Sequence, residues 1–218
     1  MAIKSKKGKF IVIEGGEGSG KTSVINYIKI KFPKFLFTHE PGGTLIGKKI
    51  RDILLNEKFK PDVLTELFLF CADRAEHINK VILPALNKNV NVVCDRFDYS
   101  TFAYQIFGRQ RFNLMKTFKI LDKIAKDNIE PDLVIYLDVN PKIGLARKEK
   151  QKTELTKFEK EKIDFHNRVR KGFLTQFKEK KYLTHSLKTK FFIIDTNHKN
   201  LHQVREEIFN ILKTSIKN

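Results

Sequence analysis

The chain has 218 residues, 41% of them hydrophobic, which suits one domain with a sizeable core, or one domain with a small appendage. Its net charge of +18 favours anionic partners such as nucleotides, nucleic acid or a membrane surface, although solvated lysines that follow genome base composition would explain the excess equally well. The two cysteines show no C-x-x-C spacing and the six histidines show no metal-ligand spacing, a pattern typical of reduced cysteines in a cytosolic protein.

The first nine residues, MAIKSKKGK, are basic like the start of a signal peptide, but only residues 10–13 follow as an apolar run. That run is too short for a signal peptide, and no stretch is long enough to span a bilayer. We therefore expect a cytoplasmic protein without a membrane partner.

The β-rich run FIVIE (10–14) leads into GGEGSGKT (15–22), which matches the phosphate-loop pattern G-x-x-x-x-G-K-[ST] between a predicted strand and a predicted helix. The glycines let backbone N–H groups turn towards phosphate oxygens, and the helix N-terminus adds partial positive charge. Lys21 can reach the β- and γ-phosphates, and Thr22 offers a hydroxyl to Mg²⁺. The loop predicts binding of ATP or GTP through Gly15, Gly16, Glu17, Gly18, Ser19, Gly20, Lys21 and Thr22.

Four more β-rich runs alternate with helical patterns: KFLFTHE (34–40), VNVVCD (90–95), DLVIYLD (132–138) and KFFIIDT (190–196). Several are almost continuously apolar, as strands covered on both faces are. The alternation predicts a three-layer α/β fold of the phosphate-loop NTPase type, with a five-stranded parallel sheet flanked by helices.

Four of the five runs end in an acidic residue, Glu14, Glu40, Asp95 or Asp138, and the fifth has Asp195 as its second-to-last residue. Ligands bind beyond the carboxyl ends of the strands in such sheets, so these acids mark the expected site. An acid in this position can also cap the following helix. We expect capping for Asp138 and Asp195 rather than for Glu40 and Asp95.

A charged segment, RKEKQKTELTKFEKEK (147–162), has almost no apolar anchors. A helical pattern with an exposed charged tip predicts a short mobile lid over an anionic ligand, although a solvated helix face is the commoner meaning of a charge run. The chain has no internal repeat and no Pro/Ser linker. We expect a single phosphate-loop kinase domain over 1–218, with the lid inserted at about 147–162.

The class of phosphate-loop protein is narrowed by what the chain lacks. GTP-binding switches read guanine with an N-K-x-D segment, which this sequence does not contain. Motor ATPases and helicases need a longer chain. A small chain with a lid favours a kinase that acts on a small metabolite.

Six stretches, in order along nearly the whole chain, resemble bacterial thymidylate kinases of the nucleoside-monophosphate kinase group. They are IEGGEGSGKT (13–22), EPGGTLIGKKIRDILL (40–55), LFLFCADRAEH (67–77), DRFDYSTFAYQ (95–105), PDLVIYLDVNPKIGLAR (131–147) and DFHNRVRKGF (164–173). The resemblance implies a homodimer that transfers the γ-phosphate of ATP to dTMP with the help of Mg²⁺, giving dTDP and ADP.

The resemblance also implies an acceptor site for dTMP. Its residues would be Glu17, Glu40, Pro41, Arg51, Phe70, Arg74, Arg96, Ser100, Thr101, Tyr104 and Gln105. Phe70 would stack on thymine, and Arg74, one helical turn further on, would bond a thymine carbonyl. Tyr104 would sit where a ribose 2′-hydroxyl needs room, and Glu17 would accept a hydrogen bond from the 3′-hydroxyl.

Most of these residues also have an ordinary structural interpretation. Phe70 could pack in the core, and Arg74 could form a surface ion pair with Asp73 or Glu76. Arg51 could lie on a solvated helix face. Thr101, Tyr104 and Gln105 could belong to an ordinary amphipathic helix.

Catalysis in this reaction needs in-line positioning and charge neutralisation rather than a strong general base, because the acceptor is already an anionic phosphate oxygen. Arg51 and Arg96 are candidate clamps for the acceptor phosphate, since a guanidinium matches phosphate oxygens bidentately. Asp95 would hold Mg²⁺ through water or orient Arg96, with helix capping as the alternative. The predicted catalytic residues are Lys21, Asp95, Arg96, Arg147 and Lys157, and the predicted metal ligands are Thr22 and Asp95.

The lid departs from the family pattern. Gly18 stands where some family members carry an arginine, so the resemblance implies that the lid supplies the missing cation. Similar enzymes have Asp-Arg in the lid, whereas this chain has Thr156-Lys157, with further lysines at Lys148, Lys150 and Lys152. A lysine supplies charge without a planar grip, so the acting residue stays open. Arg147 would grip the donor phosphate or lie on adenine.

Two other functions are compatible with the sequence. One is a kinase of the same fold that acts on another nucleoside or nucleoside monophosphate. The other is a nucleic-acid-binding protein, but the aromatic residues lie in core-like runs and are not interleaved with basic residues as a stacking platform requires. We expect dTMP and ATP as small-molecule partners and no specific nucleic acid.

Overall fold

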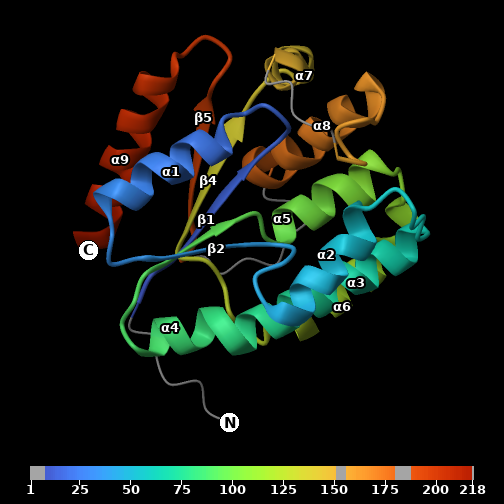
Figure 1. The fold of residues 1–218 in the computed structure, drawn as a ribbon, viewed down its shortest axis with the longest axis horizontal. Helices are drawn as coiled ribbons and strands as arrows, with labels where there is room; N and C mark the ends of the chain where they lie inside the picture. Colours follow the sequence, from blue (N-terminus) through green and yellow to red (C-terminus); the bar gives the residue numbers. More distant parts are fainter. Residues whose placement is uncertain (1–7, 151–155, 180–187, 218) are drawn as a thin grey trace.

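Each of the five β-rich runs forms one strand in the computed structural model, which describes residues 8–150, 156–179 and 188–217. The strands are β1 (Phe10–Gly15), β2 (Leu36–His39), β3 (Val92–Asp95), β4 (Leu133–Asp138) and β5 (Lys190–Asp195). They pair in parallel in the order β2-β3-β1-β4-β5 (Figure 1). The predicted five-stranded parallel sheet is confirmed.

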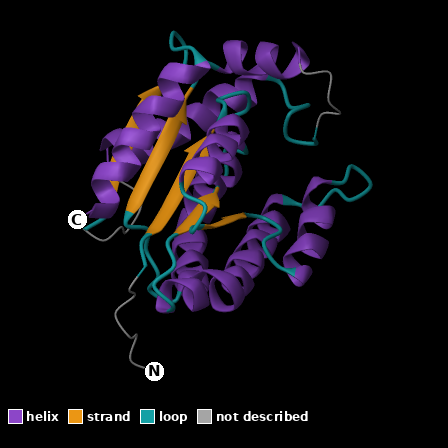
Figure 2. Ribbon diagram, turned by 60° about the vertical axis from the view of Figure 1, so that its left-hand side comes forward, coloured by secondary structure: helices purple, strands orange, loops and turns teal. Residues whose placement is uncertain are grey.

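Helices cover both faces of the sheet, which confirms the predicted three layers (Figures 1 and 2). Helices α1 (Lys21–Lys31) and α9 (Leu201–Lys217) pack through Val24, Ile28, Ile208 and Leu212 onto one face. The other face is covered by α3 (Val63–His77), η1 (Ile78–Ile82), α4 (Leu83–Asn87) and α8 (Ile163–Glu179). Successive strand side chains point to opposite faces, and in β1 both sets are buried.

The remaining helices are α2 (Leu45–Leu55), α5 (Asp98–Thr101), η2 (Phe102–Gly108), η3 (Phe112–Leu114), α6 (Met115–Lys126) and α7 (Pro141–Lys150). Helix α5 continues directly into η2, which has the wide turns of a π-helix. The sequence pattern predicts a regular α-helix here. Wide turns of this kind occur often at functional sites.

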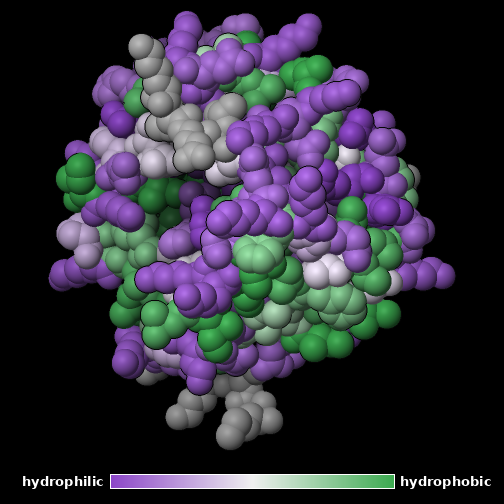
Figure 3. Space-filling model, turned by 45° about the vertical axis from the view of Figure 1, so that its right-hand side comes forward, coloured by the Kyte–Doolittle hydropathy of each residue, from purple (hydrophilic) through white to green (hydrophobic). Residues whose placement is uncertain are grey.

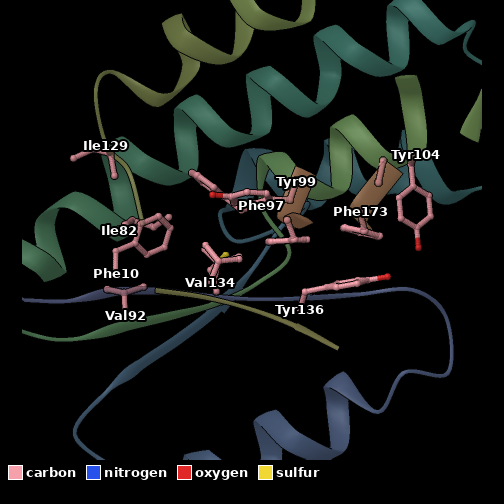
Figure 4. Close-up of a cluster of buried hydrophobic side chains, with 14 of the residues drawn as sticks. Phe10, Ile82, Val92, Phe97, Tyr99, Tyr104, Ile129, Val134, Tyr136 and Phe173 are labelled. Atoms are coloured by element: carbon pink, nitrogen blue, oxygen red, sulfur yellow. The ribbon is translucent and has the colours of Figure 1, made fainter. Parts of the chain in front are cut away.

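A Phe-rich interior, expected from 19 phenylalanines, lies between the sheet and α8 (Figure 4). Tyr136 of β4 stacks on Phe173 and Phe177 of α8, with ring centroids 4.9 and 5.1 Å apart. Tyr104 of η2 lies at the end of this cluster and meets Phe173 edge-on. The aromatic core therefore fixes the position of Tyr104 at the edge of the sheet where the strands end.

The acids at the strand ends behave differently from one another. Asp138 binds Arg170 through two hydrogen bonds of 2.8 Å, and Asp195 accepts from the backbone of Asn197. The prediction that these two acids cap helices is therefore wrong. Asn140 and Asn200 instead accept from backbone N–H groups at the starts of α7 and α9, because each stands nearer to the helix it serves.

Hydrophilic side chains cover much of the face drawn in Figure 3, and apolar side chains gather over its lower half. Within the described residues, no helix is both long and apolar enough to cross a membrane. Cys71 and Cys94 are both buried and form no disulfide. Of the predicted lid, residues 147–150 end α7 and 156–162 lead into α8, while 151–155 lie outside the described residues.

Candidate active site

A cavity of about 510 Å³ opens beside the phosphate loop, at the carboxyl ends of β1, β2 and β3. Its walls come from the phosphate loop, the β2–α2 turn, α3, the β3–α5–η2 segment and the lid. Every residue predicted for the acceptor lines it: Glu17, Glu40, Pro41, Arg51, Phe70, Arg74, Arg96, Ser100, Thr101, Tyr104 and Gln105. Lys21, Thr22 and Asp95 also line it.

The phosphate loop joins β1 to α1 with Gly18 and Gly20 in the left-handed backbone region, at φ 66° and 93°. Only glycine adopts this conformation at low cost. A Cβ on Gly18 would also lie 1.9 Å from the carbonyl oxygen of Gly144 in α7. Lys21 is 9% exposed and donates from Nζ to the Gly15 carbonyl oxygen at 2.9 Å. The loop is thus preformed, with its lysine held against the loop backbone.

Glu14, at the end of β1, joins the phosphate loop strand to the segment after β3. Its fully buried carboxylate accepts from the backbone N–H groups of Phe97 and Ser100 and from the Ser100 hydroxyl, at 2.6–3.2 Å. Burial raises the pKa of this carboxyl to about 7, although Arg96 and the three donors favour its ionised form. This bond set holds Arg96, which lies between the two segments, at the cavity wall.

Glu17, Arg96 and Tyr104 form one hydrogen-bonded cluster. Glu17 Oε1 accepts from Arg96 Nη2 at 3.1 Å and from the Tyr104 hydroxyl at 2.7 Å. The Arg96 guanidinium also lies over the Tyr104 ring, 5.1 Å from its centroid. Burial alone would raise the pKa of the Glu17 carboxyl, but the charges of Arg96 and Lys21 and the Tyr104 hydroxyl outweigh it and hold the pKa at about 2.

Arg96 itself has a left-handed backbone, at φ 68°. This conformation is uncommon for a side chain of its size and marks functional sites when the surroundings impose it. A further bond from Nη1 to the Ser100 hydroxyl, 3.1 Å long, fixes the guanidinium plane. The surrounding bonds therefore aim Arg96 into the cavity.

Arg74 lies on α3 and lines the same cavity, with only 1% of its surface exposed. Its Nε donates to Glu40, Nη1 to Asp122 and Nη2 to Thr101, at 3.1, 3.1 and 2.9 Å. Arg74 therefore does not form the surface ion pair with Asp73 or Glu76 that was the alternative interpretation. Its partners are residues distant in the chain. A guanidinium has five N–H groups, so two remain for a ligand carbonyl.

Phe70 and Arg51 face the same cavity from α3 and α2. Phe70 is half-buried rather than enclosed in the core. Arg51 donates from Nη1 to the carbonyl oxygen of Pro41 at 2.8 Å. His39 stands beside Arg51, and burial together with the Arg51 charge lowers the pKa of its imidazole, which is therefore neutral at pH 7.

The lid brings Lys148, not Lys157, into the cavity. Lys148 Nζ pairs with Glu159 at 2.9 Å, and both residues line the cavity. Lys157 Nζ pairs instead with the buried Glu66 at 2.9 Å, and Lys157 is not among the cavity residues. Arg147 also lies outside the cavity lining, bonded to the carbonyl oxygens of Gly18 and Thr196 at 3.4 and 2.8 Å.

Oxygen donors suited to Mg²⁺ are present at the phosphate end. Asp95 Oδ1 is buried without a partner among the described residues, and the Thr22 hydroxyl lines the same cavity. Magnesium prefers such oxygen ligands together with substrate phosphates, so these two residues fit the ion. A second group, Glu40, His77 and Cys94, lies within 4.8 Å, but its atoms already bond to one another or to neighbouring protein groups.

Several cavity residues and their partners are absent from the sequence predictions. These are Leu55, Phe97, Phe158 and Glu159 at the wall, with Asp122 and Glu66 behind it. The position of Phe97 at the cavity could have been predicted, because it directly follows Arg96. Asp122 is 48 residues from Arg74, and no local sequence pattern predicts that the two residues pair.

Comparison with known proteins gives a consistent result. The family model described as thymidylate kinase matches residues 13–208. A thymidylate kinase of Carboxydothermus hydrogenoformans is 42% identical over 181 residues, which cover 81% of this chain and 87% of the relative. One of the Aster yellows witches'-broom phytoplasma is 40% identical over 213 residues, covering 95% and 96%, and one of Prochlorococcus marinus (strain MIT 9301) is 43% identical over 187 residues, covering 81% and 86%.

Proposed function

The chain belongs to the thymidylate kinase family, and we propose how its cavity residues carry out the family reaction. That reaction moves the γ-phosphate of ATP to dTMP and gives dTDP and ADP. The observation that carries the proposal is the single cavity that brings Lys21 and Thr22 together with Arg74, Arg96 and Tyr104. It has a phosphate end and a base end, as a two-nucleotide reaction requires.

At the base end, Phe70 stacks on thymine and Arg74 donates to a thymine carbonyl through N–H groups that Glu40, Asp122 and Thr101 leave open. This contact is strong because the guanidinium is already desolvated and oriented, so little order is lost on binding. Around the sugar and base, Pro41, Ser100 and Gln105 complete the wall.

At the sugar, Tyr104 is locked by Glu17 and by the aromatic core, so a ribose 2′-hydroxyl would meet a ring that cannot move aside. Glu17 offers its Oε2 oxygen to the 3′-hydroxyl, since Oε1 already binds Arg96 and Tyr104. A carboxylate held ionised is a good acceptor for this purpose.

At the phosphate end, the loop backbone cradles the donor phosphates while Lys21 leaves Gly15 to bind them. Arg96 and Arg51 hold the acceptor phosphate in line for attack. Lys148, at the cavity wall, neutralises charge that develops on the transferred group. Arg147, bonded to Gly18, lies on the donor side of the loop.

Thr22 and Asp95 are proposed to hold Mg²⁺, because one is an exposed hydroxyl and the other an unpaired buried carboxylate oxygen. When bound, the ion neutralises phosphate charge. Asp95 also directly precedes Arg96, and its negative charge favours the charged form of the Arg96 guanidinium.

A substrate panel tests the function. Purified protein with ATP and Mg²⁺ is offered dTMP, dUMP, dCMP, dGMP and thymidine, and dTMP should give the highest kcat/KM. Highest turnover of thymidine would instead identify a nucleoside kinase. Lys21→Ala should abolish most of kcat, about 10³-fold, with little loss of fold, and near-normal turnover of that variant would refute the assignment.

We also propose a homodimer in the cytoplasm, built from a single domain with the lid at about 147–162. Large apolar side chains are exposed on neighbouring helices: Leu45 and Ile46 on α2, Leu64 and Phe68 on α3, and Ile120 and Ile124 on α6. Apolar surface gathers on this side in Figure 3. Patches of this kind favour association, here with a second copy.

A further inference from the structure

We propose that Glu66 is a positioning residue that fixes the amide of Gln105 for base selection and, through the same carboxylate, ties the lid to the base end of the cavity. Glu66 lies on α3 and is 1% exposed. It is outside the cavity lining, and the mechanism above does not use it. The inference rests on the proposed function, because it concerns the choice of base at that site.

Three donors meet at this one carboxylate of α3, two from η2 and its C-cap residue Arg109 and one from the lid. Oε2 accepts from Gln105 Nε2 of η2 at 3.2 Å. Oε1 accepts from Lys157 Nζ of the lid at 2.9 Å and from Arg109 Nη2 at 3.5 Å. Removing any one partner would leave charge buried without compensation and would destabilise the protein strongly. The shared carboxylate therefore holds α3, η2 and the lid in place together.

The bond to Gln105 determines which way its amide points. An ionised carboxylate accepts hydrogen bonds only, so the NH₂ group of Gln105 must face Glu66 and the carbonyl oxygen must turn away. That oxygen, Oε1, is buried and has no partner among the described residues. Gln105 contributes to the cavity wall. Glu66 therefore presents a buried acceptor at the base end.

An acceptor in the same cavity wall as the Arg74 donors selects for a base with a donor next to a carbonyl. Thymine and uracil offer this pair as N3–H and the neighbouring C4 carbonyl. Cytosine offers the reverse, an acceptor at N3 and an amino group at C4. A site with fixed polar groups rejects a mismatched partner strongly, because its own groups are left unpaired.

The lid is anchored at two adjacent residues. Phe158 meets the Tyr104 ring edge-on at 5.6 Å and lines the cavity, while Lys157 reaches out to Glu66. Arg109 lies over the Phe158 ring and pairs with Glu161, which follows in the same segment. Cutting the bond at Lys157 should therefore loosen residues 156–162 without disturbing the orientation of Gln105.

The test compares Glu66→Gln with two matched variants. A carboxamide can donate or accept, so Glu66→Gln lets the Gln105 amide flip. The dTMP over dCMP ratio of kcat/KM should fall about tenfold or more, with KM for ATP unchanged.

Lys157→Met should keep the ratio and speed amide hydrogen exchange at 156–162 about tenfold. Lys162→Met, which replaces an exposed lysine of the same segment and leaves every bond to Glu66 in place, should change neither quantity.

Two results overturn the proposal. An equal loss of dTMP and dCMP activity in Glu66→Gln, with the ratio intact, reduces Glu66 to a structural residue. Unchanged lid exchange in Lys157→Met removes the link to the lid. If Glu66→Gln does not fold, Gln105→Met replaces it, and an intact ratio in that variant refutes base selection. A wild-type protein inactive on dTMP would instead refute the proposed function, since the Glu66 readouts are measured relative to an active wild type.

Discussion

Lys148 and Lys157 belong to the same lid, yet their side chains reach different surroundings. Lys148 follows Gly144 by one helical turn, and the backbone of Gly144 contacts the phosphate loop at Glu17 and Gly18. The side chain of Lys148 therefore extends along the loop into the cavity. Both lysines have an acidic partner, but Glu159, which pairs with Lys148, lines the cavity, whereas Glu66, which pairs with Lys157, does not.

Lys148→Met should lower kcat about 100-fold with a much smaller change in KM for dTMP, because one positioned cation at the transferred group is lost. Initial-rate kinetics measure both constants. Lys150→Met is the matched control, since Lys150 is exposed on the same helix, and it should leave kcat within about twofold. A large loss of kcat in Lys157→Met but not in Lys148→Met would reassign the lid cation.

Glu17 gives the stability of the protein a defined dependence on pH. Its pKa of about 2 in the folded protein lies below the ordinary value of 4.5. The unfolded chain therefore binds the proton first as pH falls, so the stabilisation is present above about pH 4.5 and is lost towards about pH 2. Between pH 5 and pH 3.5 this loss amounts to about 1 kcal/mol.

Urea unfolding of wild type and Glu17→Gln at the two pH values isolates that contribution. Other carboxyls titrate in both proteins and cancel in the comparison. The wild type should lose about 1 kcal/mol more than the variant between pH 5 and pH 3.5. Parallel losses in the two proteins would show that Arg96 and Tyr104 do not stabilise the ionised acid.

At the scale of elements, the packing of α7 on the phosphate loop depends on a backbone-to-backbone contact. A Cβ on Gly144 would lie 2.2 Å from the Glu17 carbonyl oxygen, whereas a Cβ on Gly16 would meet nothing within 4 Å. Alanine inside a helix is ordinarily more stable than glycine by about 1 kcal/mol. The local crowding at Gly144 should reverse that sign.

Gly144→Ala should therefore lower the free energy of unfolding by about 1–3 kcal/mol and raise KM for ATP, because α7 must move away from the loop. Thermal unfolding of Gly144→Ala and Gly16→Ala provides the comparison. The Tm of Gly16→Ala should stay close to that of the wild type. A stabilised Gly144→Ala protein would mean that α7 does not rest on the loop in solution.

The strands could be predicted because their signal is local. A run such as VNVVCD carries its apolar pattern within a few residues, and the structure trims it only at the first two positions, to Val92–Asp95. The wide π-turns of η2 could not be predicted, because they arise where α8 packs closely on η2. Gly172 of α8 lies so close that a Cβ would be 2.8 Å from Phe107.

The residues of the site also divide into those with a local sequence signal and those without one. The phosphate loop could be identified from eight consecutive residues, and the acceptor residues from a resemblance that spans the chain. The partners that orient them could not. Asp122 meets Arg74 across 48 residues and Glu66 meets Lys157 across 91, and such pairings follow from how the helices pack rather than from the sequence around either residue.

At the scale of the whole molecule, the exposed apolar side chains of α3 and α6 predict self-association. Phe68 is 50% exposed and Ile124 is 70% exposed. Phe68→Asp combined with Ile124→Asp should convert a dimer into a monomer, because a charge in an apolar interface loses its hydration. Light scattering after size exclusion gives the mass directly.

Ile30→Asp is the matched control for that experiment. Ile30 is 77% exposed on α1, which covers the opposite face of the sheet from α3. Its replacement should leave the mass unchanged. A monomeric wild type, or a dimer that survives both aspartates, would exclude this surface as the interface.

The bonds that Glu14 makes have a consequence for motion during turnover. They clamp the end of β1 to the start of α5, so the donor cradle and the Arg96 guanidinium move as one rigid body. We therefore expect any closure around two nucleotides to come from the other elements of the cavity wall, α2 and the segment 147–162, which carry Arg51 and Lys148.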